Sequence, residues 1–185
     1  MPDPDGLKLP RELLIVGAAA ELGIFEALRA PLDPGALAGL LGIERRGVDL
    51  LCGALCGLGY LVEEHGLLSL TAEAVDLFYN PGGRDYLGFS FLYDYYDMNY
   101  WLQLPEAVRT GRPARGPHGE KVLTALLEKL GRLAEETAPG VAALCLEGLG
   151  DSPRVVDIGG GSMAYARAFA GSGARVTVLD LPPVI

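Results

Sequence analysis

The chain has 185 residues, half of them apolar, so it is long enough to bury one sizeable core or two smaller ones. Fifteen Lys and Arg residues against 24 Asp and Glu residues give a formal net charge of −9, and no basic patch is concentrated along the sequence. Because this charge repels nucleic-acid phosphates and anionic lipids, we expect a globular protein that binds neither nucleic acid nor membrane.

The cysteines and the N-terminal residues favour a cytoplasmic protein. The three cysteines are odd in number and form no CxxC pair, which is typical of buried thiols in a reducing compartment and predicts neither disulfides nor a metal site. The opening residues "MPDPDG" are acidic, unlike a signal peptide. The longest apolar run, Leu13 to Ala20, is far shorter than the roughly 20 residues of a membrane span.

Start and stop signals predict the first helices. The periodic segment from Leu13 to Leu28 indicates one helix, or two broken near Gly23. Asp33 followed by Pro34 predicts the start of the next helix, and Gly42 predicts its end. A third helix is expected from about Arg45 to Leu58.

A β-hairpin is expected after these helices. The stretch "YLVEEHGLLSLT" contains two strand-like runs around a polar tip, and Thr71 can cap a following helix that Asn80 to Gly82 would end. Helices followed by a hairpin are the order of a winged helix. We therefore predict a mainly α winged-helix region at residues 1–84.

Aromatic residues dominate the next segment. Eight of the chain's fourteen aromatic residues lie between Asp85 and Trp101, a density that favours a core or a subunit interface over a ligand cage. The basic stretch "RTGRPARGPHG" that follows is rich in Pro and Gly and predicts a hinge loop. We assign residues 85–118 to this aromatic helical segment and hinge.

The last part, residues 119–185, is predicted to hold linker helices and a β-α-β unit. "EKVLTALLEKLGRLAEET" forms an amphipathic helix that Pro139 and Gly140 should end, and a shorter helix is expected from Val141 to Leu149. The unit then comprises a buried strand, a tight turn, a helix, a second strand and a terminal acid. These are Arg154 to Ile158, Gly159 to Ser162, Met163 to Ala170, Arg175 to Leu179, and Asp180.

The β-α-β unit carries the signature of a site for an adenosine-containing cofactor. Glycines bring backbone amides close to a ligand, and Asp180, 21 residues after Gly159, can accept hydrogen bonds from a ribose diol. The spacing of Gly159, Gly161 and Ala164 also satisfies the weak dinucleotide pattern GxGxxG/A. The carboxylate of Asp157 would attract the cationic amino-acid end of S-adenosylmethionine and would repel a pyrophosphate, so it favours S-adenosylmethionine over a dinucleotide. A structural turn without a ligand remains an alternative.

The sequence resembles a known family of enzymes. "VVDIGGGS" and "VTVLDLPPVI" are similar to the first two cofactor motifs of class I S-adenosylmethionine-dependent O-methyltransferases, in the branch of plant and bacterial small-molecule enzymes. Upstream, "AAAELGIFEAL", "LAGLLGIERRGVDLLCGALCGLGYL", "GLLSLTAEA" and "LPEAVRTGRP" resemble the family's winged-helix dimerisation region. The resemblance covers Leu13 to Ile185 and implies a Rossmann-like α/β catalytic domain, of which this chain would hold the start.

The resemblance also implies roles for residues. It places S-adenosylmethionine against six residues of the two motifs, namely Asp157, Gly159, Gly160, Gly161, Asp180 and Leu181. It assigns helices of the aromatic segment to the pocket for a small hydroxyl acceptor, for which the candidates are Phe89, Tyr96, Tyr100 and Trp101. It further implies a homodimer formed through the N-terminal helical region.

Two departures from the family pattern qualify this interpretation. Met163 stands where family members usually have another glycine, which would weaken cofactor binding. The sequence supplies two of the seven strands expected of a complete sheet, so we expect an N-terminal portion that is inactive alone. No catalytic residue is assigned, because the family's base lies in the later part of the fold and neither His65 nor His118 is near the glycine turn in sequence.

Three functions therefore remain open. The first is methyl transfer to a phenol, polyketide or pigment-like hydroxyl acceptor. The second is an inactive dimerisation module or pseudoenzyme, which Met163 favours. The third is a winged-helix DNA-binding regulator, which the two basic and seven acidic residues between Asp33 and Tyr79 argue against.

Overall fold

The computed structural model describes residues 9–113, 120–182 and 184. The chain divides into two compact units, Met1–Met98 and Asn99–Ile185, and most of the secondary structure is helical. The predicted hinge loop extends into residues 114–119, which lie outside the described residues.

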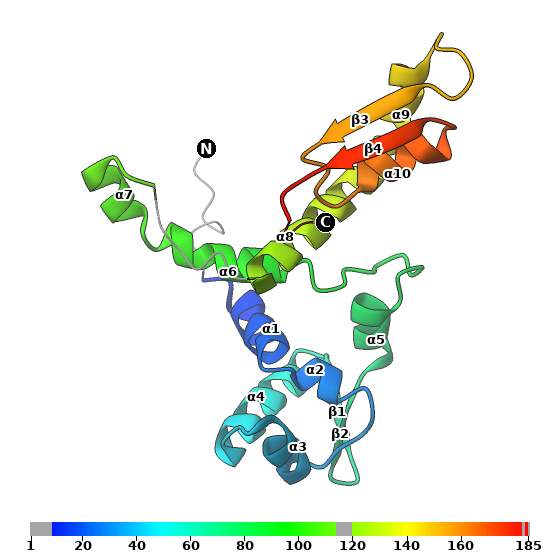
Figure 1. Ribbon diagram of the computed structural model, residues 1–185. Coiled ribbons are helices and arrows are strands. Elements are labelled where there is room, and N and C mark those ends of the chain that lie inside the picture. The colour runs from blue at the N-terminus through cyan, green and yellow to red at the C-terminus, as the bar shows by residue number, and fades with distance from the viewer. Residues whose placement is uncertain (1–8, 114–119, 183, 185) are drawn as a thin grey trace, which may run out of the picture. The chain divides into compact units, whose positions relative to one another are not determined.

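The N-terminal unit contains four helices, then a hairpin, then a further helix, as Figure 1 shows. In chain order these are α1 (Arg11–Glu21), α2 (Ile24–Ala27), α3 (Pro34–Leu41), α4 (Arg45–Gly57), β1 (Leu61–Glu64), β2 (Leu67–Leu70) and α5 (Ala72–Tyr79). The predicted order of helices followed by a hairpin is therefore confirmed. Helix α6 (Leu92–Trp101) then crosses the division between the units.

The boundaries of these helices follow from local chemistry. Gly23, at φ 80°, separates α1 from α2. The Oδ1 atom of Asp33 accepts hydrogen bonds from the backbone N–H groups of Gly35 and Ala36 at 2.9 and 3.0 Å, which caps α3. The hydroxyl of Thr71 likewise accepts from the N–H of Ala74 at 3.1 Å and caps α5. All three predicted signals are confirmed.

The hairpin is antiparallel, with Leu61 paired to Leu70. His65 and Gly66 form its tip at φ 53° and 78°, the two positive values of a tight hairpin turn. A bridge between Leu32 and Leu68 joins the second strand to the segment before α3. The hairpin thereby becomes part of the helical unit.

An apolar core with an aromatic centre holds the N-terminal unit together. Its largest fully buried side chains come from α2, α3 and α4 and the residue after α2: Ile24, Phe25, Leu28, Leu37, Val48, Cys52 and Leu55. Phe78 stacks on Tyr60 and on Phe89, with ring centroids 5.8 and 5.4 Å apart. Phe91 is buried in the same core, so part of the aromatic segment serves as core, as its composition predicted.

The C-terminal unit consists of helices and one pair of strands. After the end of α6, its elements are α7 (Leu104–Thr110), α8 (Glu120–Glu135), α9 (Ala138–Leu146), β3 (Arg154–Ile158), α10 (Ala164–Gly171) and β4 (Arg175–Leu179). Two predicted boundaries are wrong. Helix α8 ends at Glu135, and Pro139 and Gly140 lie in the first turn of α9, where proline is tolerated because that N–H needs no helical partner.

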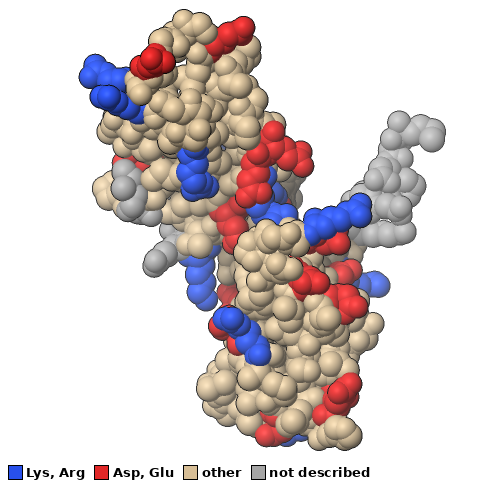
Figure 2. Space-filling view, turned by 90° about the vertical axis from the view of Figure 1, so that its right-hand side faces the viewer, with Lys and Arg blue, Asp and Glu red and all other residues tan. Residues whose placement is uncertain are grey.

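The charge on the described surface is mixed. On the face shown in Figure 2, Lys and Arg side chains lie in small separate groups with acidic side chains between them. On α4, Arg45 donates a hydrogen bond of 2.8 Å to Asp49, which offsets part of its charge. No helix within the described ranges has the length and apolar character needed to cross a bilayer.

Candidate cofactor site

Strands β3 and β4 form a parallel pair that positions the glycine turn. Arg154 is paired with Arg175 and Ile158 with Leu179, so both strands finish at the same edge. Helix α10 packs against both strands (Figure 1). The β-α-β unit is therefore present, and its two loops at the carboxyl ends of the strands lie side by side.

The prediction that β3 is buried is wrong for one face of the pair. Val156, Ile158 and Leu179 are 59%, 80% and 52% exposed, whereas the alternate residues Val155 and Val178 are half-buried. The reason is that α10 covers one side of the strands and no other described element of the C-terminal unit covers the opposite side. An apolar sheet face of this kind is normally covered in parallel α/β folds.

Each glycine of the turn has its own structural reason. Gly159 and Gly161 adopt φ values of 75° and 50°, where residues with a Cβ are disfavoured. At Gly160, a Cβ would lie 2.5 Å from Cγ1 of Val178, so only glycine fits against β4. The N–H of Gly159 donates to the carbonyl of Leu179 at 2.7 Å, which fixes the turn to the end of the neighbouring strand.

Met163 ends the turn in the left-handed conformation, with φ 64° and ψ 9°. Its N–H donates to the carbonyl of Gly160 at 2.9 Å, and its carbonyl accepts from the N–H of Arg167 at 2.9 Å. The backbone conformation explains why glycine suits this position, because L-residues avoid the left-handed region. The side chain of Met163 does not prevent the turn from forming.

Asp157 carries a buried oxygen that faces the turn. Within the described part of the chain, its Oδ2 atom is buried and has no hydrogen-bond partner. The same atom would lie 3.2 Å from a Cβ placed on Gly160, so it is next to the turn backbone. A buried carboxylate oxygen without a donor is costly. This atom is therefore suited to a ligand that brings a cationic or N–H donor.

Asp180 is already bonded to the turn. Its Oδ2 atom accepts a hydrogen bond of 2.7 Å from the N–H of Gly161, and its Oδ1 atom accepts one of 2.7 Å from the N–H of Leu181. A carboxylate has about four lone-pair sites, so acceptor capacity remains for the hydroxyls of a ribose. The side chain of Leu181 is 70% exposed and lies next to this carboxylate in sequence.

Helix α8 lies against the other side of the turn, a contact that was not predicted from the sequence. Cδ2 of Leu127 would be 3.7 Å from a Cβ on Gly161, and Cβ of Ser162 would be 3.3 Å from a Cβ on Gly131. The signal in the sequence was Gly131, a small residue inside an otherwise amphipathic helix. It allows α8 to approach the turn closely.

The predicted acceptor-pocket residues are divided between the units. Phe89 and Tyr96 belong to the N-terminal unit, where Phe89 packs on Phe78 and the Tyr96 ring meets that of Tyr95 at 5.4 Å. Tyr100 and Trp101 belong to the C-terminal unit, and Trp101 is 66% exposed. Their joint role in a pocket stays a prediction.

No described residue of this site is a histidine. His65 forms the tip of the hairpin in the N-terminal unit, and His118 lies outside the described residues. Among the residues that the structure describes, no three His, Cys, Asp or Glu side chains are grouped to hold a metal ion. The site thus consists of two carboxylates and a backbone turn.

Three solved structures with similar folds are methyltransferases. Mitomycin 7-O-methyltransferase MmcR is 25% identical to this chain with a TM-score of 0.71, and the match covers 97% of this chain and 57% of that protein. An O-methyltransferase family protein from Burkholderia thailandensis is 22% identical with a TM-score of 0.69, over 94% of this chain and 54% of that one.

A third similar structure is human N-acetylserotonin methyltransferase in complex with SAM, which is 24% identical with a TM-score of 0.63 over 94% of this chain and 56% of that protein. The chain thus spans little more than half the length of these structures. No family model matches the sequence, and no curated protein matches it. The shared fold includes both the helical unit and the glycine turn, because the matches cover nearly the whole chain.

Proposed function

We propose that the chain, which has the fold of the S-adenosylmethionine-dependent O-methyltransferases, binds S-adenosylmethionine at the turn between β3 and α10. The observation that carries this proposal is the buried Oδ2 atom of Asp157, which has no hydrogen-bond partner in the described structure. The amino group of the cofactor's methionine part would supply the missing donor.

The other residues of the turn fit the same ligand. Nothing in the described structure lies within 4 Å of the position that a Cβ on Gly159 would take, so this part of the turn is open to a ligand. Asp180 keeps acceptor capacity for two ribose hydroxyls. A dinucleotide would fit less well, because its pyrophosphate would approach the carboxylate of Asp157. Asp157 therefore favours S-adenosylmethionine over NAD, whereas Asp180 suits the ribose of either ligand.

The proposed reaction is transfer of a methyl group to the hydroxyl of a small aromatic, polyketide or pigment-like acceptor. When bound, the cofactor would supply the electrophilic sulfonium methyl. The residues of this chain would hold the amino-acid end through Asp157 and the ribose through Asp180, and so orient the methyl group. We also propose that the N-terminal unit is a winged-helix dimerisation domain and the C-terminal unit the start of a Rossmann-like domain.

We further propose that methyl transfer requires residues additional to this chain. Two observations support this: the apolar face of β3 and β4 is exposed, and the chain spans 54% to 57% of three methyltransferases of similar fold. The 185-residue chain is then expected to bind cofactor weakly and to transfer nothing. Methyl transfer from radiolabelled cofactor to a phenol panel by the purified chain would contradict this.

Calorimetry with S-adenosylmethionine tests the binding proposal directly. Asp157→Asn is expected to reduce affinity about tenfold or more, because it removes the charge that faces the cofactor's amino group. Asp151→Asn, in the exposed loop before β3, is the matched control and should leave affinity unchanged. Equal binding by the chain and Asp157→Asn, or no binding by the chain and by Met163→Gly, would refute cofactor binding at the turn.

The second candidate is a dimerisation module with a vestigial turn. Met163 favours it, because its side chain stands at a position suited to glycine. Cofactor binding by Met163→Gly alone would indicate that the turn has lost its ligand in the natural sequence. If neither the natural chain nor Met163→Gly binds the cofactor, and light scattering shows a stable dimer, the dimerisation module is favoured.

We propose a homodimer formed through the N-terminal helices in the cytoplasm, where the three free cysteines would stay reduced.

We propose no nucleic-acid partner, because acidic side chains lie among the basic ones on the face in Figure 2. A salt-dependent gel shift with duplex DNA would contradict this.

A further inference from the structure

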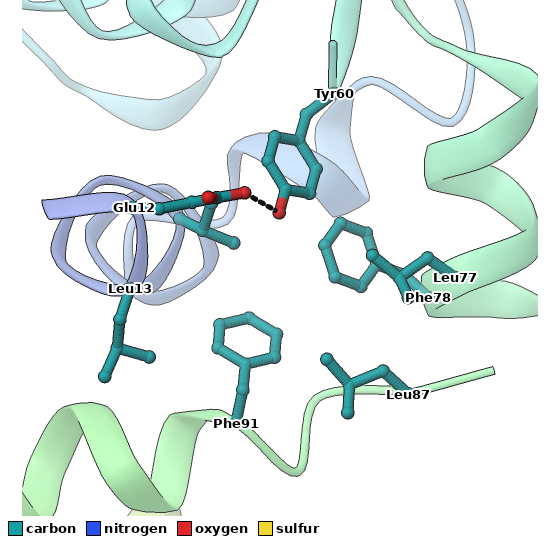
Figure 3. A pocket seen from close by; sticks show the side chains of 8 residues that line it. Glu12, Leu13, Tyr60, Leu77, Phe78, Leu87 and Phe91 are labelled. Carbon is teal, nitrogen blue, oxygen red and sulfur yellow. Dashed lines mark hydrogen bonds between the residues drawn. The ribbon is translucent and has the colours of Figure 1, made fainter. Parts of the chain in front are cut away.

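A cavity in the N-terminal unit is unrelated to the glycine turn. It has a volume of about 280 Å³ and lies between α1, α5 and the segment before α6, as Figure 3 shows. All of its lining residues belong to the unit Met1–Met98. Its shape therefore does not depend on where the C-terminal unit lies.

The walls of the cavity are apolar and partly rigid. They are formed by six side chains: Leu13, Val16, Leu77, Phe78, Leu87 and Phe91. Val16, Phe78 and Phe91 are at most 8% exposed and belong to the packed core, so this side of the cavity is formed by the core of the N-terminal unit. A cavity of about 150 Å³ already accommodates benzene, so this one has room for an aromatic ring with a short alkyl chain.

One polar pair interrupts these apolar walls. The hydroxyl of Tyr60 donates a hydrogen bond of 2.7 Å to Oε1 of Glu12, and both side chains line the cavity (Figure 3). Burial, followed by the hydrogen bond to Glu12, raises the pKa of Tyr60 to about 12, so the phenol remains a donor at neutral pH. Tyr60 thereby holds one oxygen of Glu12 in place and leaves the carboxylate further acceptor sites.

The charge of the lining decides the class of ligand. Glu12 is the single ionisable acid or base among the lining residues besides the neutral Tyr60. A carboxylate at the edge of an aromatic and aliphatic pocket attracts a cation and repels an anion. Small pockets with few polar groups use those groups to fix the orientation of the ligand.

We propose that this cavity is a binding site for a small amphiphilic amine, with its apolar body among Leu13, Leu87 and Phe91 and its ammonium group on Glu12. The ligand class is a primary aryl-alkyl or alkyl amine. A neutral alcohol of the same shape should bind more weakly, and a carboxylate should be rejected.

The test uses the full chain and three probes of one shape, namely phenylbutylamine, phenylbutanol and phenylbutyrate. Affinity is measured by calorimetry, and the site is located by changes in the aromatic NMR signals of Tyr60 and Phe91. Phenylbutylamine is expected to bind about fivefold more tightly than phenylbutanol, the size of effect of a partly exposed ion pair. Phenylbutyrate should show no binding.

Three variants separate the contributions of charge and cavity. Glu12→Gln should lower the affinity of phenylbutylamine to that of phenylbutanol. Glu64→Gln, on the hairpin, is the matched control and should leave the affinities of both probes unchanged. Leu87→Trp should abolish binding of both probes by filling the cavity. Because Glu12 is exposed, its variant should fold even if Leu87→Trp does not.

Several outcomes would overturn the proposal. They are no binding of phenylbutylamine at millimolar concentration, equal affinity for phenylbutyrate, unchanged affinity in Glu12→Gln, and unchanged binding in a folded Leu87→Trp. If phenylbutylamine instead dissociates a dimer without moving the signals of Tyr60, the cavity is part of a subunit contact and is not a ligand site.

Discussion

The carboxylate of Asp180 accepts a hydrogen bond of 2.7 Å from the backbone N–H of Gly161, 19 residues earlier in the chain. One acid at the end of β4 thus holds the glycine turn that follows β3. The side chain proposed to bind a ribose is also a structural element of the site. Loss of Asp180 should therefore affect the folded chain even without ligand.

Asp180→Ala is expected to destabilise the C-terminal unit by about 1 to 3 kcal/mol. It removes the acceptor of two backbone N–H groups, of Gly161 and Leu181, and hydrogen bonds to charged groups are the stronger kind. Urea unfolding checks this, with Asp151→Ala, in an exposed loop, as the control. Equal midpoints for the two variants would show that the bonds contribute no net stability.

Met163→Gly should stabilise the chain by up to about 1 kcal/mol. Met163 has φ 64°, a conformation that costs an L-residue energy and glycine almost none. Met163→Ala removes the side chain but keeps the Cβ, so it should give no gain. A larger gain from alanine than from glycine in chemical denaturation would mean that the Met163 side chain, and not its backbone, causes the cost.

Gly160→Ala and Gly171→Ala should change stability in opposite directions. At Gly160 a Cβ would lie 2.5 Å from Val178, so the turn or β4 must shift at a cost of about 1 to 3 kcal/mol. At Gly171, the last residue of α10, no atom lies within 4 Å and alanine should add about 0.5 to 1 kcal/mol. Two destabilised variants in thermal melts would contradict this.

Local signals in the sequence were sufficient for most element boundaries. Asp33, Thr71 and Gly23 act on their own neighbours, so the ends of α1, α3 and α5 were predictable from chemistry within a few residues. Pro139 shows the limit of this approach. Proline either ends a helix or begins one, and here the gap between α8 and α9 lies at residues 136–137, before the proline.

The site was only partly predictable for a related reason. Asp157, the glycines and Asp180 follow from spacing, because the ends of two parallel strands lie together. The contact of α8 with the turn at Gly131 and the exposure of Val156 depend on how elements pack, which no local pattern encodes. The bond from Gly161 to Asp180 likewise needs the three-dimensional arrangement.

Alkaline pH should destabilise the N-terminal unit between about pH 10 and pH 12. Burial, with a hydrogen bond to Glu12, raises the pKa of Tyr60 to about 12, and burial with the charge of Glu26 raises that of Tyr79 to about 12. The fold therefore favours the protonated phenols. The contribution of these two phenols to the free energy of unfolding is complete below the unfolded pKa of 10. It is lost as the pH rises through 12.

Tyr60→Phe tests this pH dependence. The variant should show a smaller loss of stability between pH 10 and pH 12 than the natural chain, since one of the groups with a raised pKa is absent. Urea midpoints across that range measure the slope, and tyrosinate absorbance follows the titration. A slope as steep as that of the natural chain would mean that Tyr60 ionises freely in the folded state.

Val155→Thr and Val156→Thr provide the same substitution on opposite faces of β3. Val155 is half-buried on the side covered by α10, so its hydroxyl would lose water and cost about 1 to 2 kcal/mol. Val156 is 59% exposed on the uncovered face, so Val156→Thr should stay within about 0.5 kcal/mol and should reduce self-association seen in light scattering. If the two variants lose equal stability, Val156 is buried in solution and the expected difference between the two faces is wrong.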